Sequence, residues 1–167
     1  MRFLTAIALM LSVALSPPAA TATTAPNTGE LKAAIVYNII RFTRLPPQPS
    51  SRLTMCVLAN GETARAFEHL DGRGVPDGRL SIRFISRPEE IRSGCAIAFV
   101  QGDMPSSALS GATVTIGDVD RFIDRGGMVE LRRFGRQIVF EVNNQAAARK
   151  GVQFSARLLN LASVVHQ

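Results

Sequence analysis

The sequence LTMCVLANGETARAFEHL, residues 53–70, contains the clearest indication of the fold class. Its first seven residues form a short, continuous apolar run, which is typical of a strand covered on both faces. Asn60 and Gly61 favour a turn, and residues 62–70 then suit a helix. Strands that alternate with helices in this way are typical of a parallel sheet between helical layers. Further strand patterns occupy residues 80–84, 96–100 and 112–116.

A first helix is predicted before this unit. Thr28 is the expected N-cap, and Glu30 lies in the first turn, where a negative charge suits the helix dipole. Pro46 and Pro47 end the helical pattern. The apolar residues spread over a wide face, so we expect this helix to be buried on two sides or to form part of an interface.

The C-terminal part continues the alternation. Residues 128–131 and 137–142 flank the sequence RRFGR, residues 132–136, and this spacing predicts a β-hairpin. Residues 144–150 suit a helix, and residues 155–165 close the chain with a wide apolar face. We therefore predict one layered α/β domain in which a mostly parallel sheet is flanked by helices and followed by a C-terminal β-hairpin.

The first 22 residues have the layout of a secretory signal peptide. Arg2 precedes an apolar stretch over residues 3–15, and Ala20-Thr21-Ala22 supplies the small residues of a cleavage site. The stretch is shorter than the roughly 20 residues of a membrane span, although an uncleaved anchor is the alternative. We expect export to the periplasm with cleavage near Ala22, a flexible leader over residues 23–29, and the folded domain over residues 30–167.

The chain is strongly basic. It has 19 Lys and Arg against 13 Asp and Glu, a formal net charge of +6. Such a charge suits an acidic protein surface, an anionic lipid or nucleic acid, or is simply a solvated surface. Nucleic acid fits poorly with export, and no run of Lys or Arg exceeds two residues. The chain also has one Tyr and no Trp to stack on bases, so no nucleic-acid partner is expected.

The two cysteines, Cys56 and Cys95, would meet an oxidising compartment after export. A disulfide between them would close a loop of 39 residues, which chain-entropy arithmetic associates with roughly 4 kcal/mol of stabilisation. Two buried free thiols and a redox pair are the alternatives, but the CxxC spacing typical of redox pairs is absent.

No catalytic or cofactor-binding motif is present. The chain has neither the G-x-S-x-G of hydrolases nor a phosphate-binding loop. Its two histidines, His69 and His166, have no partner at metal-ligand spacing. Asp118 and Asp120 are the best carboxylate pair, but a strand-to-helix turn with an Asp cap explains them without a metal or acid/base chemistry. We therefore predict a non-enzymatic protein without catalytic residues, metal or cofactor.

The tip of the predicted hairpin is the candidate partner-binding site. Arg132, Arg133 and Arg136 surround Phe134, and aromatic residues and arginines are enriched among the residues that dominate protein interfaces. The alternative is an ordinary polar turn with Phe134 folded back onto the sheet.

Five segments, taken in order, resemble the YfiR family of periplasmic regulators. Each is a weak signal alone, but their order and spacing are specific. One departure is that Arg44 and Leu45 stand where members often have an acidic residue and Trp. The segments are LKAAIVYNIIRFTRLP (31–46), MCVLANG (55–61), GVPDGR (74–79), SGCAIAFV (93–100) and IVFEVNNQAAARKGVQFSARLLNLA (138–162).

This resemblance implies a non-catalytic, often dimeric α/β domain. Such proteins restrain a membrane diguanylate cyclase of the YfiN type through its periplasmic region, which lowers cyclic di-GMP signalling and biofilm formation. An outer-membrane lipoprotein of the YfiB type can sequester the regulator. The resemblance also matches Cys56 and Cys95 to positions that form a disulfide in some members. The alternative function is a small-ligand-binding sensor, in which Arg79 or Arg83 meets an anion at a crevice of the sheet.

Overall fold

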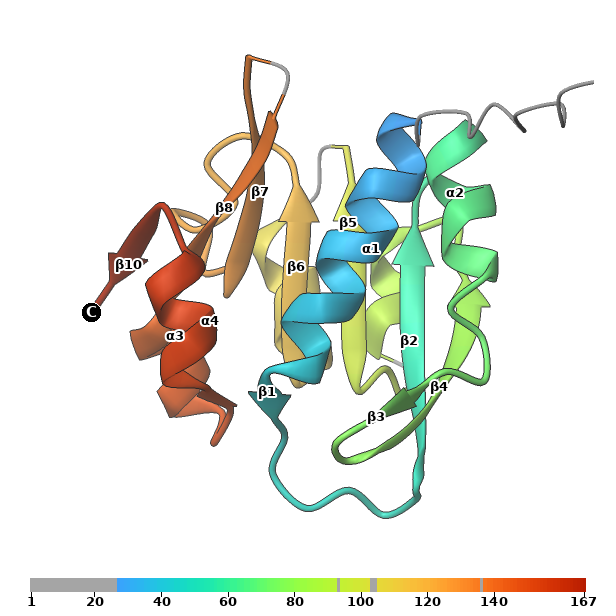
Figure 1. Cartoon of the computed structure of the whole chain (residues 1–167). Coiled ribbons are helices and arrows are strands. Elements are labelled where there is room, and N and C mark those ends of the chain that lie inside the picture. Colours follow the sequence, from blue (N-terminus) through green and yellow to red (C-terminus); the bar gives the residue numbers. More distant parts are fainter. Residues whose placement is uncertain (1–26, 93, 103–104, 136) are drawn as a thin grey trace, which may run out of the picture.

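A computed structural model describes residues 27–92, 94–102, 105–135 and 137–167. Within these residues lies one eight-stranded sheet with the strand order β10-β8-β7-β6-β5-β2-β4-β3 (Figure 1). The predicted signal peptide lies outside the described residues. The strands of the sheet are β2 (Arg52–Leu58), β3 (Gly74–Val75), β4 (Gly78–Phe84), β5 (Ile97–Gln101), β6 (Val114–Asp118), β7 (Val129–Phe134), β8 (Gln137–Asn143) and β10 (Val164–His166).

The sheet is mostly parallel. Parallel pairing joins β4 to β2, β2 to β5, β5 to β6 and β6 to β7. The hairpin partner β8 is antiparallel to β7, and the short β3 is antiparallel to β4. The prediction of a layered α/β domain with a mostly parallel sheet and a C-terminal hairpin is therefore confirmed.

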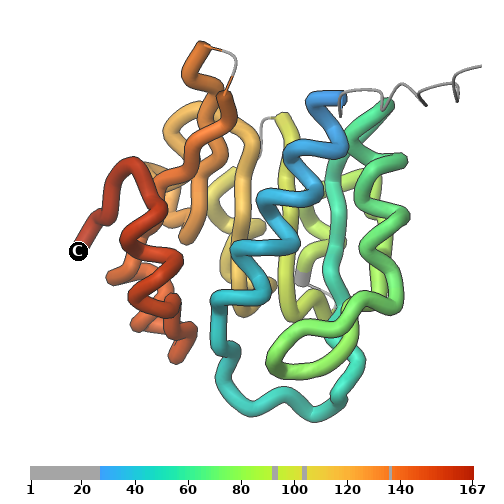
Figure 2. Tube along the Cα trace, in the orientation of Figure 1, coloured from blue at the N-terminus to red at the C-terminus, as the bar shows by residue number. Residues whose placement is uncertain are grey.

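The two faces of the sheet have different covers. The α-helices lie over one face, while 3-10 helices and turns lie over the other (Figures 1 and 2). A separate two-stranded ribbon, β1 (Thr43–Arg44) with β9 (Gln153–Phe154), ties the end of the first helix to the C-terminal segment. The helices are α1 (Thr28–Arg41), α2 (Gly61–Glu68), α3 (Asn144–Arg149) and α4 (Ala156–Leu161), and the 3-10 helices are η1 (Pro88–Arg92) and η2 (Ser106–Gly111).

The central strands are buried on both faces because successive side chains point to opposite sides. In β2, Met55 and Val57 pack into the core under the helices, whereas Cys56 joins the core on the other face. In β5, Phe99 stacks on Phe67 of α2 with ring centroids 4.3 Å apart. This explains why the apolar runs predicted as strands show no polar alternation.

Helix α1 begins with a capping box. The side chain of Asn27 accepts a hydrogen bond from the Glu30 amide, and the Glu30 carboxylate accepts one from the Asn27 amide. The N-cap is thus Asn27, and the prediction of Thr28 was wrong by one residue. Residues 28 and 29 accordingly belong to the helix and not to the leader. Where the chain is described, no helix is long and apolar enough to cross a membrane.

The C-terminal segment contains two elements. Helix α4 begins at the N-cap Ser155 and ends at Leu161. The chain then turns, and β10 pairs in parallel with β8 at the edge of the sheet. The apolar face predicted over residues 155–165 is therefore divided between a helix and an edge strand.

Phe122 lies in the turn between β6 and β7 and packs into the core on the face of the sheet that has no α-helices. Its side chain is fully buried and lies against Gly117 and Gly127, where an added Cβ atom would overlap the aromatic ring. Both glycines are required by this close approach, because any larger residue would displace Phe122.

We expect Gly117→Ala to reduce the free energy of unfolding by about 1–3 kcal/mol, since it adds a methyl group to a filled core. Gly74→Ala is the control, because nothing lies within 4 Å of its added Cβ. Chemical denaturation of the two variants tests this. The Phe122→Leu substitution should cost less in the Gly117→Ala background than in the wild type; equal costs would contradict the assigned contact.

Candidate functional site

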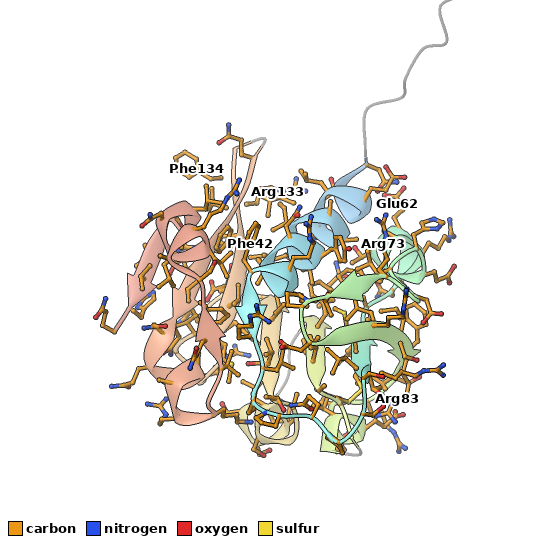
Figure 3. The ribbon with its side chains drawn as sticks, turned by 60° about the horizontal axis from the view of Figure 1, so that its bottom comes forward. Phe42, Glu62, Arg73, Arg83, Arg133 and Phe134 are labelled. Carbon is orange, nitrogen blue, oxygen red and sulfur yellow. A yellow bond between two sulfur atoms is a disulfide. The ribbon has the colours of Figure 1, made fainter. Side chains whose placement is uncertain are left out.

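The tip of the β7–β8 hairpin projects beyond the ends of the neighbouring strands (Figure 1). Phe134 is the last residue of β7, and its side chain is 74% exposed. It therefore does not fold back onto the sheet, as the alternative interpretation required. Arg133, the preceding residue of β7, is also exposed, and Figure 3 labels both residues at this end of the hairpin. Arg136, the third arginine predicted at this tip, lies outside the described residues.

Arg132 is directed away from the tip. Its guanidinium group donates a hydrogen bond of 2.5 Å to Glu141 on β8 and lies 3.9 Å from Glu130 on its own strand. The structure therefore divides the predicted cluster. Arg133 and Phe134 are presented to solvent, while Arg132 joins a polar network at the base of the hairpin.

This basal network is built on two buried carboxylates, Glu130 and Glu141. Glu130 accepts hydrogen bonds from the backbone amides of Arg121 and Ile123, at 3.3 and 3.2 Å. Arg121 has φ 60°, a left-handed conformation that a side chain rarely adopts, and this turn directs its amide at the carboxylate. Glu141 contacts the ring of His166 on β10 at 3.0 Å. The network lines a cavity of about 370 Å³.

Two pKa values within the network are shifted. The hydrogen bond from His166, and then the bond from Arg132, lower the pKa of Glu141 despite its burial. The same contact with Glu141 raises the pKa of Arg132. Glu141 is therefore held as a carboxylate, which attaches the C-terminal strand β10 to the hairpin.

Sequence reasoning did not find this network. The sequence pattern offers His166 only as a possible metal ligand and singles out neither Glu130 nor Glu141. A signal was present, because Glu130 and Arg132 fall on one face of β7 and the hairpin register places Glu141 opposite Glu130. No sequence pattern indicates that β10 pairs with β8 and brings His166 to Glu141, because this pairing depends on the tertiary structure.

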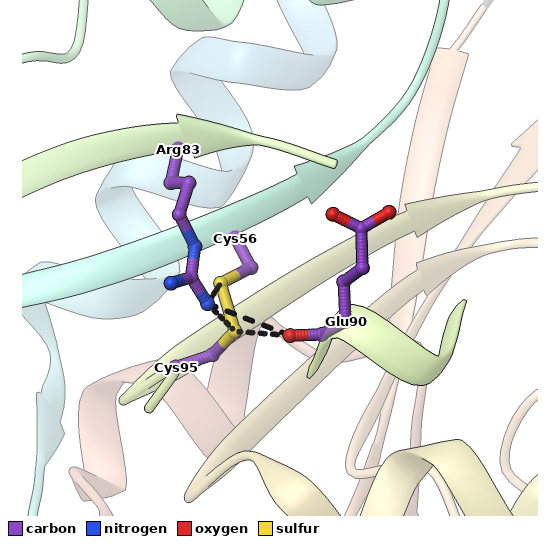
Figure 4. The surroundings of a disulfide bond; sticks show 4 residues. All are labelled: Cys56, Arg83, Glu90 and Cys95. Carbon is purple, nitrogen blue, oxygen red and sulfur yellow. Dashed lines mark hydrogen bonds between the residues drawn. A yellow bond between two sulfur atoms is a disulfide. The ribbon is translucent and has the colours of Figure 1, made fainter. Parts of the chain in front are cut away.

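Cys56 and Cys95 form a disulfide, as expected, with a Cα–Cα distance of 5.6 Å. Arg83 of β4 lies over this bond, and its Nη2 is 3.1 Å from the Cys56 sulfur and 3.2 Å from the Cys95 sulfur (Figure 4). Arg79, at the start of β4, donates a hydrogen bond to the carbonyl oxygen of Gly72. Each of the two arginines named as an alternative anion ligand thus has a partner within the protein.

The carboxylate pair Asp118 and Asp120 is also divided. Asp118 forms an ion pair of 2.5 Å with Lys32 of α1, whereas Asp120 lines the cavity beneath the hairpin. His69, the C-cap of α2, is exposed. Among residues 27–167 other than 93, 103, 104 and 136, no group of three or more His, Cys, Asp or Glu side chains is arranged to hold a metal ion.

A family model described as YfiR/HmsC-like matches residues 29–163. The chain belongs to the YfiR/HmsC-like family. The matched segment runs from the first turn of α1 to the end of the turn before β10, so the family similarity covers almost the whole described fold. The resemblance predicted from the five sequence segments is confirmed. No curated protein sequence matches the chain significantly.

Two solved structures align with this chain over most of its length. A conserved domain protein from Vibrio cholerae aligns with a TM-score of 0.53 and 10% identity over 83% of this chain and 60% of that protein. An ABC domain in complex with L-Trp from Streptococcus pneumoniae aligns with a TM-score of 0.48 and 9% identity over 82% and 60% of the two chains. The chain thus spans about 60% of each structure. The first similarity shows a shared α/β fold, and the second score is too low for a structural conclusion.

We expect Glu141→Gln to reduce the free energy of unfolding by about 1–3 kcal/mol at neutral pH, because it removes a buried charged acceptor. A lowered carboxyl pKa stabilises the fold above the unfolded pKa of about 4 and loses this contribution as pH falls through the folded value. The difference between variant and wild type should therefore shrink in acid. Denaturation curves at several pH values, with the exposed Glu89→Gln as the control, test this; a difference that is constant with pH would contradict it.

Replacing both Cys56 and Cys95 with Ala should cost about 4 kcal/mol of stability, as expected for opening a loop of 39 residues. Denaturation of the oxidised protein and the double variant measures this cost. Adding a reductant should destabilise the wild type by a similar amount and leave the double variant unchanged. A double variant as stable as the oxidised wild type would contradict this prediction. It would show that packing alone holds the 3-10 helices and turns that cover the disulfide.

Proposed function

We propose that this protein is a non-catalytic periplasmic regulator that binds the periplasmic region of a membrane diguanylate cyclase of the YfiN type and restrains it. The family match over residues 29–163 is the observation on which the proposal rests. Lower cyclic di-GMP signalling and less biofilm would follow from this restraint. The N-terminal secretory pattern supports a periplasmic location.

We propose the exposed hairpin tip, Arg133 and Phe134, as the contact surface for the cyclase. An exposed Phe beside an Arg combines two residue types that contribute most to protein interfaces. The tip is also supported by a rigid base, since Glu130 and Glu141 fix the backbone and Arg132 beneath it. A preorganised tip loses little conformational entropy on binding, which favours affinity.

The regulator acts by population shift under this proposal. It binds the inactive form of the cyclase more tightly than the active form, so its presence moves the equilibrium toward the inactive form. Sequestration by an outer-membrane lipoprotein of the YfiB type would remove the regulator and release the cyclase. Assembly of the regulator as a homodimer is part of the same proposal and would present two hairpin tips in one particle.

Phe134→Ala should weaken binding to the purified periplasmic region of the cyclase by about 30-fold or more, which corresponds to about 2 kcal/mol for a dominant interface residue. Arg133→Ala should weaken it by a smaller factor. Biolayer interferometry with the mature protein measures both effects, and circular dichroism checks that each variant is folded.

Phe84→Ala is the matched control for this experiment. Phe84 is also an exposed phenylalanine, 43% accessible, but it ends strand β4 near the opposite edge of the sheet. The Phe84→Ala variant should bind the periplasmic region of the cyclase with the affinity of the wild type. Equal losses in the two variants would exclude the tip as the specific contact, and no binding by the wild type would contradict the proposed function itself.

A further inference from the structure

A second site lies where α1 ends and the β1–β9 ribbon begins. It is a cavity of about 280 Å³ that residues of β1 help to line, and Figure 1 shows β1 at the end of the molecule opposite the hairpin tip. Arg41 and Arg44 line it together with the partly buried ring of Phe42 and the buried ring of Phe154. Pro76, in the turn between β3 and β4, completes the wall. The cavity thus combines guanidinium groups with an apolar lining.

Arg41, one of the two arginines that line the cavity, lies over an aromatic ring, as do two arginines outside the lining, Arg73 and Arg157. The guanidinium carbon of Arg157, from α4, lies 5.2 Å from the centroid of Phe42. Those of Arg41 and Arg73 lie 5.8 and 5.1 Å from the centroid of Tyr37. Figure 3 shows Phe42 and Arg73 on this side of the molecule. Stacking on a ring positions a guanidinium group without using its N–H donors.

Little negative charge offsets these arginines. In the described part of the chain, Arg41, Arg73 and Arg157 form no ion pair, and Arg44 approaches Asp77 only at 3.7 Å. Asp77 also accepts a hydrogen bond from the Leu45 amide through its other oxygen, at 2.9 Å. The side chain of Arg44 is 68% exposed. Of these arginines, Arg41 and Arg44 line the cavity, so two guanidinium groups can present N–H donors there.

We propose that this arginine pocket binds a phosphate ester. Arginine recognises phosphate through paired hydrogen bonds, and two guanidinium groups at one cavity suit an anion with several acceptor oxygens better than a single carboxylate. Phe42, Phe154 and Pro76 would contact the organic part of the ester. The phosphate belongs either to a free small molecule or to a phospholipid headgroup, since both present the same oxygens. This site is independent of the proposed cyclase contact.

The pocket is tested with the folded mature protein and two probes. Inorganic phosphate is titrated while the NMR signals of the arginine Nε–H groups are followed. Vesicles of phosphatidylglycerol and phosphatidylcholine in equal parts are compared with phosphatidylcholine vesicles by co-sedimentation. The test variant is Arg41→Gln/Arg44→Gln. The control variant, Arg65→Gln/Arg149→Gln, removes the same charge from exposed arginines outside the pocket.

We expect phosphate to shift the signals of Arg41 and Arg44 in the wild type. Binding should weaken about tenfold or more in the test variant and less than about twofold in the control, because charge-assisted hydrogen bonds are specific to geometry. Binding of phosphate without vesicles would support a free ligand, and preferential binding of the anionic vesicles a headgroup. Absence of binding to both probes, or equal losses in the two variants, would overturn the proposal.

Discussion

The fold depends on the burial of both faces of strands β2, β5 and β6. Alternate side chains of β2 and β5 enter two separate cores, and each core requires its own cover. Four α-helices supply a thick layer on one face. On the other face the cover consists of 3-10 helices and turns, which bury less apolar surface. The Cys56–Cys95 disulfide and the buried ring of Phe122 lie in this thinner layer, where covalent and steric constraints compensate for the missing helices.

The polar network beneath the hairpin has a different role from these cores. Buried charges gain little net stability even when they are paired, because their desolvation offsets the attraction between them. Glu130 and Glu141 are therefore better understood as positioning residues. They fix the left-handed turn at Arg121, the guanidinium of Arg132 and the edge strand β10 relative to one another. The network therefore links the base of the projecting hairpin to the edge strand and to the turn at Arg121.

The features predicted correctly from the sequence are those set by local patterns. Short apolar runs identified the strands, and RRFGR identified the hairpin, because burial and turn formation act over a few residues. The predicted N-cap was wrong by one residue because Asn27 and Thr28 both belong to the residue types that cap helices, and the reciprocal contact with Glu30 identifies Asn27. The contacts of Arg83 with the disulfide and of His166 with Glu141 join residues 12 or more positions apart. Their register follows from tertiary packing, which single-sequence patterns do not encode.

The two proposed surfaces lie at opposite ends of the sheet (Figure 1), and this arrangement limits how they can influence each other. The inner face of α1 is buried in the same core as the central strands, so the helix offers no second arrangement of its own. A ligand changes a distant equilibrium only to the extent that it binds two states with different affinity. Occupancy of the arginine pocket would therefore add a second contact or a membrane attachment to the regulator. It would leave the affinity of the hairpin tip for its partner unchanged.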